Sequence, residues 1–307
     1  MFRPLSRIFL LTPLLVCQGQ AQSPRGMLLE EVVDYESTEA VQEAFTRYAN
    51  VEEPSKWKLA PESLTFAGHF PPSGGALLSM PNEGAAIELS EVLQVTGDPG
   101  DNQWLGRSFT VYISFLVRSE HFEPWYLGGC GGGLATSSRH DGIGGGIGRK
   151  GNKPAPFGPF AIAGGRFRLM PTAGENRFHA EGEVQPGETY LILMRIDYTN
   201  PSEAPYNPFS GQGETRVRLA CYREGESYPA AEQVVEWDID ATTPNSMRGE
   251  SLFLDHFTVA CGASFADGYL VDDIRVATSF NLVTVPEPAA MSLLLGATIG
   301  IFAWRKR

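Results

Sequence analysis

Three carboxylates at alternate positions, Glu236, Asp238 and Asp240, have the spacing that most suggests chemistry in this sequence. Alternate side chains of a β-strand project to the same face, so one strand would place the three carboxylates side by side. Retaining glycosidases use two carboxyl groups roughly 5 to 5.5 Å apart, one as nucleophile and one as acid/base. The motif therefore suggests glycoside hydrolysis as a hypothesis. No cluster of aromatic residues accompanies it, so we interpret it as the solvated outer face of an ordinary strand, with no catalytic residue.

Oxygen ligands for calcium are a second kind of candidate. The aspartates concerned are Asp255, Asp267, Asp272 and Asp273. Oxygen-rich loops bind Ca²⁺, but no EF-hand or repeat signature accompanies these residues, so we interpret them as solvated turn carboxylates and predict no cofactor. The five histidines are His69, His121, His140, His179 and His256. Their spacing does not suit zinc, and we expect no transition-metal site.

A glycine-rich stretch covers residues 128–133 and 142–151. It contains one Gly-x-Gly-x-x-Gly match, at Gly146, Gly148 and Gly151, but a dinucleotide site needs a strand before it and a helix after it. Lys153, Pro154 and Pro156 follow instead, so we expect a loop or a pair of glycine-rich hairpins. The charged residues within and beside it form a candidate ligand rim. They are Arg139, His140, Asp141, Arg149 and Lys150.

The N-terminal 21 residues have the three parts of a secretory signal peptide. Arg3 and Arg7 precede the apolar run 8–16, and Gly19, Gln20 and Ala21 supply small residues before a cleavage site. The apolar run is too short to span a bilayer, so we predict removal of residues 1–21 by cleavage after Ala21. Lipid attachment at Cys17 is disfavoured, because the bulky Val16 stands where a small residue is required.

The C-terminal residues form a stop-transfer pattern over 285–307. Pro286, Glu287 and Pro288 precede the uncharged segment 289–304, and the basic residues Arg305, Lys306 and Arg307 end the chain. The segment is somewhat shorter than the roughly 20 residues of a comfortable membrane span, and the basic cluster would stay cytoplasmic. We predict a transmembrane helix at 289–304 that holds the chain at the membrane transiently.

Val-Pro-Glu-Pro, a short apolar helix and a final basic cluster together resemble the PEP-CTERM sorting signal of bacteria with an outer membrane. The resemblance implies that an exosortase in the inner membrane processes the chain near residues 286–288. It also implies delivery to the cell surface or the extracellular matrix. A plain C-terminal membrane anchor is the alternative interpretation.

The net charge of −12 restricts the class of partner. Removing the basic residues of both ends makes the remaining body still more acidic, which argues against binding of nucleic acid or of an anionic surface.

Three cysteines remain after signal removal: Cys130, Cys221 and Cys261. Cys221 shares strand parity with Val217 and Leu219, and Cys261 lies in the apolar run 257–261, so both side chains should point inward. Export permits a disulfide, and a Cys221–Cys261 bridge is one hypothesis. Two buried thiols are the alternative.

Residues 22–284 read as one all-β domain with one short helix. The helix is expected at 37–49, where Val41, Ala44, Phe45 and Tyr48 share a face. Period-two patterns separated by Gly, Pro and Asn indicate strands beyond Trp57. They cover 64–68, 85–89, 108–118, 160–169, 189–198, 215–222, 233–239, 252–261 and 269–278. Many antiparallel strands without alternating helices favour a two-sheet antiparallel sandwich, most naturally a jelly roll.

Three stretches, 110–118, 187–198 and 268–280, resemble concanavalin A-like, laminin-G-like jelly-roll domains. The resemblance implies a noncatalytic domain that binds extracellular polysaccharide, or another surface component, through loops at one edge. A second hypothesis comes from laminarinase-like jelly-roll hydrolases, whose catalytic strand has glutamate where this chain has Asp240. A third is a purely structural matrix protein.

Overall fold

The computed structural model describes the body of the chain between residues 26 and 284, with gaps. The described residues are 26–47, 50–66, 73–78, 80, 83–94, 109–119, 130–135, 157–163, 166–169, 178–179, 184–199, 214–229, 231–244, 253–260 and 269–284.

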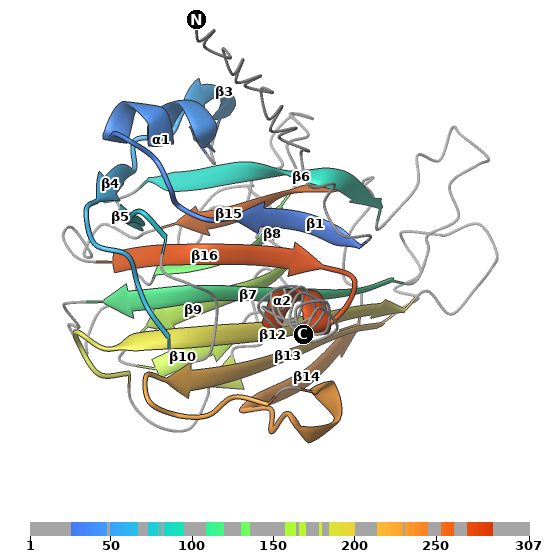
Figure 1. The fold of residues 1–307 in the computed structure, drawn as a ribbon. Helices are drawn as coiled ribbons and strands as arrows, with labels where there is room; N and C mark the ends of the chain where they lie inside the picture. The colour runs from blue at the N-terminus through green and yellow to red at the C-terminus, as the bar shows by residue number, and fades with distance from the viewer. Residues whose placement is uncertain are drawn as a thin grey trace, which may run out of the picture.

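Two eight-stranded sheets form the body, and all of their described strand pairs are antiparallel (Figure 1). Sheet A contains β1 (Met27–Glu31), β4 (Lys58–Ala60), β5 (Ala76–Leu78), β7 (Phe109–Ser119), β12 (Thr189–Thr199), β13 (Glu214–Arg223), β14 (Ile239–Pro244) and β16 (Tyr269–Ala277). Sheet B contains β2 (Thr46–Arg47), β3 (Asn50–Pro54), β6 (Gly84–Gln94), β8 (Cys130–Ala135), β9 (Phe157–Ala163), β10 (Arg166–Leu169), β11 (Phe178–His179) and β15 (Phe253–Ala260).

The strand order places the last strand of the chain inside sheet A. That order is β14-β13-β12-β7-β16-β5-β4, with β1 also paired to β16. One side of β16 therefore meets β7, and its other side meets β5 and β1. Sheet B runs β11-β10-β9-β8-β15-β6-β2-β3.

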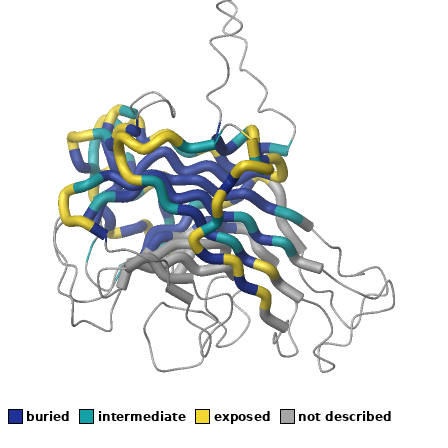
Figure 2. The backbone as a smooth tube through the Cα atoms, turned by 90° about the horizontal axis from the view of Figure 1, so that it is seen from below, coloured by how far each residue is buried: buried dark blue, intermediate teal, exposed yellow. Residues whose placement is uncertain are grey.

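The main core lies between the two sheets, as the predicted sandwich requires. On β7, Val111, Ile113, Phe115 and Val117 are fully buried in it, while alternate residues face the other way. Phe115 of sheet A meets Phe257 of sheet B with ring centroids 5.7 Å apart, so the two inner faces are in contact. Figure 2 shows the buried residues concentrated in the strands and exposed ones in the connections. The two-sheet antiparallel prediction is confirmed.

The N-terminal helix is shorter than the predicted 37–49. Helix α1 covers Thr38–Ala44, with the Ser37 side chain accepting a hydrogen bond from the Ala40 N–H as its N-cap. Phe45 adopts an extended conformation, and β2 begins at the next residue and pairs with β6. Because Thr46 pairs with β6, the helix ends before it reaches Tyr48, the last apolar residue of the predicted helical face.

Three predicted strands are corrected. Residues 64–66 form no strand, because the Leu64 N–H donates to the Asp272 carboxylate and not to a neighbouring strand. The predicted strand 160–169 is instead two antiparallel strands, β9 and β10, with Ala163 paired opposite Arg166. Most of 233–239 is a 3₁₀ turn, η1 (Glu232–Val234), and an irregular segment before β14.

The second helix, α2 (Asn281–Thr284), lies on the outer side of sheet A, against β16 and β7 (Figure 1). Among the described segments no helix is long and apolar enough to cross a membrane. The predicted transmembrane helix at 289–304 and the signal peptide at 1–21 lie outside the described residues.

Candidate functional site

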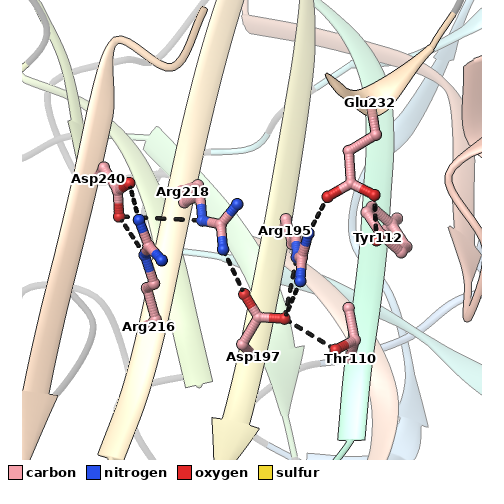
Figure 3. Close-up of polar contacts among 8 residues, drawn as sticks. All are labelled: Thr110, Tyr112, Arg195, Asp197, Arg216, Arg218, Glu232 and Asp240. Atoms are coloured by element: carbon pink, nitrogen blue, oxygen red, sulfur yellow. Dashed lines mark hydrogen bonds and ion pairs between the residues drawn. The ribbon is translucent and has the colours of Figure 1, made fainter. Parts of the chain in front are cut away.

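The outer face of sheet A carries a set of polar side chains on three adjacent strands. Arg195 and Asp197 on β12 alternate with the buried Met194 and Ile196, so their side chains point away from the core. Arg216 and Arg218 on β13 and Asp240 on β14 point to the same outer side (Figure 3).

Eight residues are linked by these polar contacts, and we call them the outer-face cluster. They are Thr110, Tyr112, Arg195, Asp197, Arg216, Arg218, Glu232 and Asp240 (Figure 3).

Asp197 is the central acceptor of the outer-face cluster. Its Oδ1 accepts hydrogen bonds from Arg195 Nε at 2.9 Å and Nη2 at 2.7 Å, and from Thr110 Oγ1 at 2.8 Å. Its Oδ2 accepts from Arg218 Nη2 at 3.1 Å. One carboxylate thus fixes two guanidinium groups from neighbouring strands.

The two ends of the cluster are held differently. At the exposed end, Arg216 forms a two-pronged ion pair with Asp240, with Nε 2.6 Å from Oδ1. Their side chains are 47% and 37% exposed, so a ligand can reach both. At the other end, Glu232 of η1 accepts hydrogen bonds from Arg195 and from the Tyr112 hydroxyl, the latter at 2.7 Å.

Two aromatic rings support the arginines. The Arg195 guanidinium carbon lies 5.5 Å from the Tyr112 ring centroid, and that of Arg218 lies 5.8 Å from the Trp237 centroid. Both distances are within the range of cation–π attraction. The rings therefore help to fix the orientation in which the guanidinium groups present their donors.

Charge within the outer-face cluster is balanced, since three arginines meet three carboxylates. Hydrogen bonding from Arg216 lowers the pKa of Asp240. Burial lowers the pKa of Arg218, and the neighbouring charge of Arg195 lowers it further. The buried Nε of Arg218 makes no hydrogen bond to the part of the chain that the structure describes. Fixed donors and fixed acceptors alternate across this surface without a large net charge.

The three carboxylates singled out from the sequence do not share one strand. Asp240 belongs to β14 and is ion-paired with Arg216, whereas Asp238 precedes the strand and its Oδ2 accepts from the Cys221 N–H at 2.7 Å. Glu236 is exposed on the irregular segment. The 3₁₀ hydrogen bond from the Val235 N–H to the Glu232 carbonyl interrupts the expected alternation.

The calcium candidates Asp272 and Asp273 are buried in β16, not solvated in a turn as predicted. Both oxygens of Asp272 already accept hydrogen bonds, and Asp273 is ion-paired with Arg275. Asp267 and the side chain of Asp255 lie outside the described residues. Within the described segments no group of three or more His, Cys, Asp or Glu residues is arranged to hold a metal ion.

Other sequence candidates are only partly described. Residues 130–133 of the glycine-rich stretch belong to β8, which pairs with β9 and β15, so this part is a central strand and not a loop. The charged rim from Arg139 to Lys150 lies outside the described residues. Of the histidines, His256 is buried on β15.

Cys221 faces the core between the sheets, as its strand parity predicts. Burial raises the pKa of its thiol well above the usual value. It is a free thiol in the structure, and Cys261 lies outside the described residues, so the Cys221–Cys261 disulfide stays a prediction.

A groove of about 500 Å³ between β1 and β6 is a weaker candidate site. Glu30, Glu88 and Ser90 provide its polar groups, and its remaining walls are aliphatic. It lacks the alternating donors, acceptors and aromatic rings of the outer-face cluster.

Sequence reasoning missed the four central residues of the cluster: Arg195, Asp197, Arg216 and Arg218. A signal was present, because each alternates with buried aliphatic residues on a predicted strand. What the sequence lacked was the pairing of β12 with β13, which brings Asp197 opposite Arg216.

Comparison with known proteins identifies the C-terminal end. Residues 284–307 match the PEP-CTERM protein-sorting motif, which confirms the sequence resemblance. The motif indicates an exported protein tied to the cell envelope. Among curated protein sequences, no significant match is found.

Solved structures give distant likenesses. The T. cruzi calreticulin globular domain has a TM-score of 0.40 and 11% identity, covering 83% of this chain and 88% of that one. An endo-β-1,4-glucuronan lyase from Trichoderma reesei has a TM-score of 0.38 and 12% identity, covering 76% of this chain and 91% of that one. Arcelin-5, a lectin-like defence protein from Phaseolus vulgaris, has a TM-score of 0.37 and 12% identity, covering 74% of this chain and 93% of that one. Similarity at this level assigns neither a ligand nor an activity.

Proposed function

We propose that this chain, sorted by its PEP-CTERM motif, is a cell-surface or extracellular-matrix protein whose noncatalytic jelly-roll domain binds polysaccharide through the outer-face cluster. In this proposal the signal peptide 1–21 is removed after Ala21, and segment 289–304 inserts transiently in the inner membrane. An exosortase then processes the chain near Pro286–Glu287–Pro288, which leaves the domain 22–284.

The alternation of fixed donors and acceptors in the outer-face cluster is the observation that supports polysaccharide binding. A guanidinium group only donates hydrogen bonds and a carboxylate only accepts them, whereas a sugar hydroxyl does both. Arg216 and Asp240 present one of each at the exposed end of the cluster. Neighbouring hydroxyls of a sugar ring can therefore accept from the arginine and donate to the aspartate.

Charge balance favours a neutral polysaccharide over a polyanion. The three arginines are already paired with Asp197, Asp240 and Glu232, and the whole chain carries −12. A polyanion would have to displace a carboxylate and overcome this repulsion. Hydroxyl groups need only insert between existing partners, so we expect neutral glucans or mannans.

The laminarinase-like alternative has less support. Retaining hydrolysis needs a carboxyl group that keeps its proton until it protonates the leaving group. The Arg216 hydrogen bond lowers the pKa of Asp240 and so favours the ionised form. Glu236 and Asp238 lie before the strand, where the expected side-by-side arrangement is lost. A purely structural role would give neither binding nor turnover.

We expect Arg216→Ala to weaken binding of a neutral polysaccharide about tenfold, equivalent to about 1.4 kcal/mol. Its unfolding temperature should change by only about 2 °C, because exposed ion pairs contribute little to stability. A glycan microarray of neutral glucans, mannans and polyuronates identifies the ligand, and isothermal titration calorimetry measures the change in affinity.

Arg223→Ala is the matched control for this prediction. Arg223 lies on the same strand, is 50% exposed and is ion-paired with Glu188, but it is outside the outer-face cluster. Equal affinity of the two variants would place binding elsewhere. Release of reducing ends from the bound polysaccharide would favour the hydrolase, and absence of binding to every polysaccharide would favour the structural role.

A further inference from the structure

Val283, just before the sorting motif, and Thr284, the first residue of the motif, are held on the outer face of sheet A. The Val283 side chain is fully buried there, and the Ser114 hydroxyl donates to the Val283 carbonyl at 2.6 Å. Thr284 is also fully buried, and its carbonyl accepts from the Tyr228 hydroxyl at 2.8 Å. The chain therefore leaves the domain from this face at the point where the motif begins.

This exit point adjoins the outer-face cluster. Phe280, which precedes α2, makes an edge-on contact with Tyr112, with ring centroids 5.9 Å apart. Tyr112 in turn contacts Arg195 and donates to Glu232 of the cluster. The segment before the tail thus contacts the outer-face cluster at its Tyr112–Glu232 end, which is the end opposite Arg216 and Asp240.

The tail offers little length between the domain and a membrane. Four residues, 285–288, connect Thr284 to the apolar segment 289–304. Fully extended, four residues span at most about 14 Å. If the segment is inserted, the membrane surface lies close to the face from which Thr284 emerges.

The N-terminal end of the domain lies at the same corner. The Gly26 carbonyl accepts a hydrogen bond from the Thr278 N–H at 2.8 Å, and β1 then runs antiparallel to β16. Only residues 22–25 separate Gly26 from the expected cleavage site after Ala21. The first described residue, Gly26, therefore lies beside α2, at the end of the domain where the last described residue, Thr284, is found.

We infer that the membrane-held precursor faces the membrane with the outer face of sheet A, and that removal of the tail uncovers the outer-face cluster. This inference rests on the proposed membrane insertion of the tail. Its consequence is that polysaccharide binding begins only after processing, because a polymer cannot fit readily between the cluster and a membrane so close to it.

Fluorescence quenching in nanodiscs tests the orientation without relying on polysaccharide. Residues 22–307 are reconstituted in phosphatidylethanolamine–phosphatidylglycerol nanodiscs that contain a lipid-borne quencher. A fluorophore is attached through p-azidophenylalanine at position 242 or, as the control, at position 56. Thr242 is exposed opposite Arg216 on the outer face, whereas Lys56 is bonded to Glu83, beside sheet B.

We expect at least threefold stronger quenching at position 242 than at position 56. A 24-residue Gly-Ser insertion after Thr284 should abolish the difference, because it extends the average reach to about 27 Å. Cutting at an engineered protease site after Thr284 should abolish quenching altogether. Equal quenching at both positions in the tethered chain would overturn the inference.

Affinity for a neutral polysaccharide is measured on the same samples without the fluorophore. We expect at least tenfold weaker binding by the tethered chain than by the cleaved chain, with the Gly-Ser insertion restoring it. Equal affinity of the tethered and cleaved chains would contradict the inference that removal of the tail uncovers the cluster. Selective quenching at position 242 without binding by any form would support the orientation and overturn the proposed polysaccharide function.

Discussion

Replacing Asp272 with alanine should lower the free energy of unfolding by about 3–5 kcal/mol, because buried donors lose their acceptor. The Oδ2 of Asp272 accepts from the Leu64 N–H at 2.9 Å and from the Ser63 hydroxyl at 3.0 Å. Its Oδ1 accepts from the Ser73 hydroxyl at 2.8 Å and from the Asp273 N–H at 2.7 Å. The carboxylate therefore joins the segment around Ser63 and Ser73 to the central strand of sheet A.

Urea unfolding monitored by circular dichroism measures this loss, which corresponds to a fall in unfolding temperature of roughly 10 °C for a domain of this size. Asp238→Ala is the control, because Asp238 also accepts a backbone N–H but is exposed, and it should cost about 1 kcal/mol or less. Equal losses in the two variants would show that the Asp272 network contributes no special stability.

Glu31→Gln should make the protein about 2 kcal/mol more stable than the native chain at pH 8, with little difference at pH 4. Burial raises the pKa of Glu31 to about 7, a hydrogen bond with Tyr35 opposes the rise, and the charge of Asp272 adds to it. The folded chain therefore holds this proton more tightly than the unfolded chain does. Native stability should fall as pH rises from about 4.5 to 7, and glutamine removes this loss.

Urea unfolding of both proteins between pH 4 and pH 8 gives the difference directly. Asp273 behaves with the same sign, since burial raises its pKa to about 7, so the single substitution removes only part of the pH dependence. Glu39→Gln is a control of opposite sign, because hydrogen bonding at the start of α1 lowers the pKa of Glu39. A parallel pH dependence of the Glu31→Gln and native proteins would contradict the role of Glu31.

Alternation in the sequence predicted the strands that have one face in the main core. The 108–118 prediction matches β7 because Val111, Ile113 and Phe115 enter the core between the sheets. Alternation failed at 233–239, where Val235 is buried against the outer face of sheet A while Val234 is 66% exposed. The buried valine of this segment packs in a second hydrophobic cluster, with Tyr112 and Phe280 on the outer face of sheet A, and not in the core between the sheets.

The outer-face cluster could not be predicted from the sequence for a different reason. Arg218 and Asp197 are 21 residues apart, and Arg195 and Glu232 are 37 apart. Only the pairing of strands and the position of η1 bring these charges together. Asp272 was misassigned to a solvated turn because its partners, Ser63 and Leu64, lie more than 200 residues away.

The position of β16 inside sheet A affects how the protein can be secreted. This strand comes late in the chain, yet it lies between β7 on one side and β1 and β5 on the other and forms strand hydrogen bonds with all three. The strand pairing of sheet A therefore cannot be completed while residues 269–277 are still inside a translocation channel. Pairing between strands so distant in sequence also slows folding. If the chain crosses a membrane unfolded, we expect its native topology to be complete only after residues 269–277 have crossed.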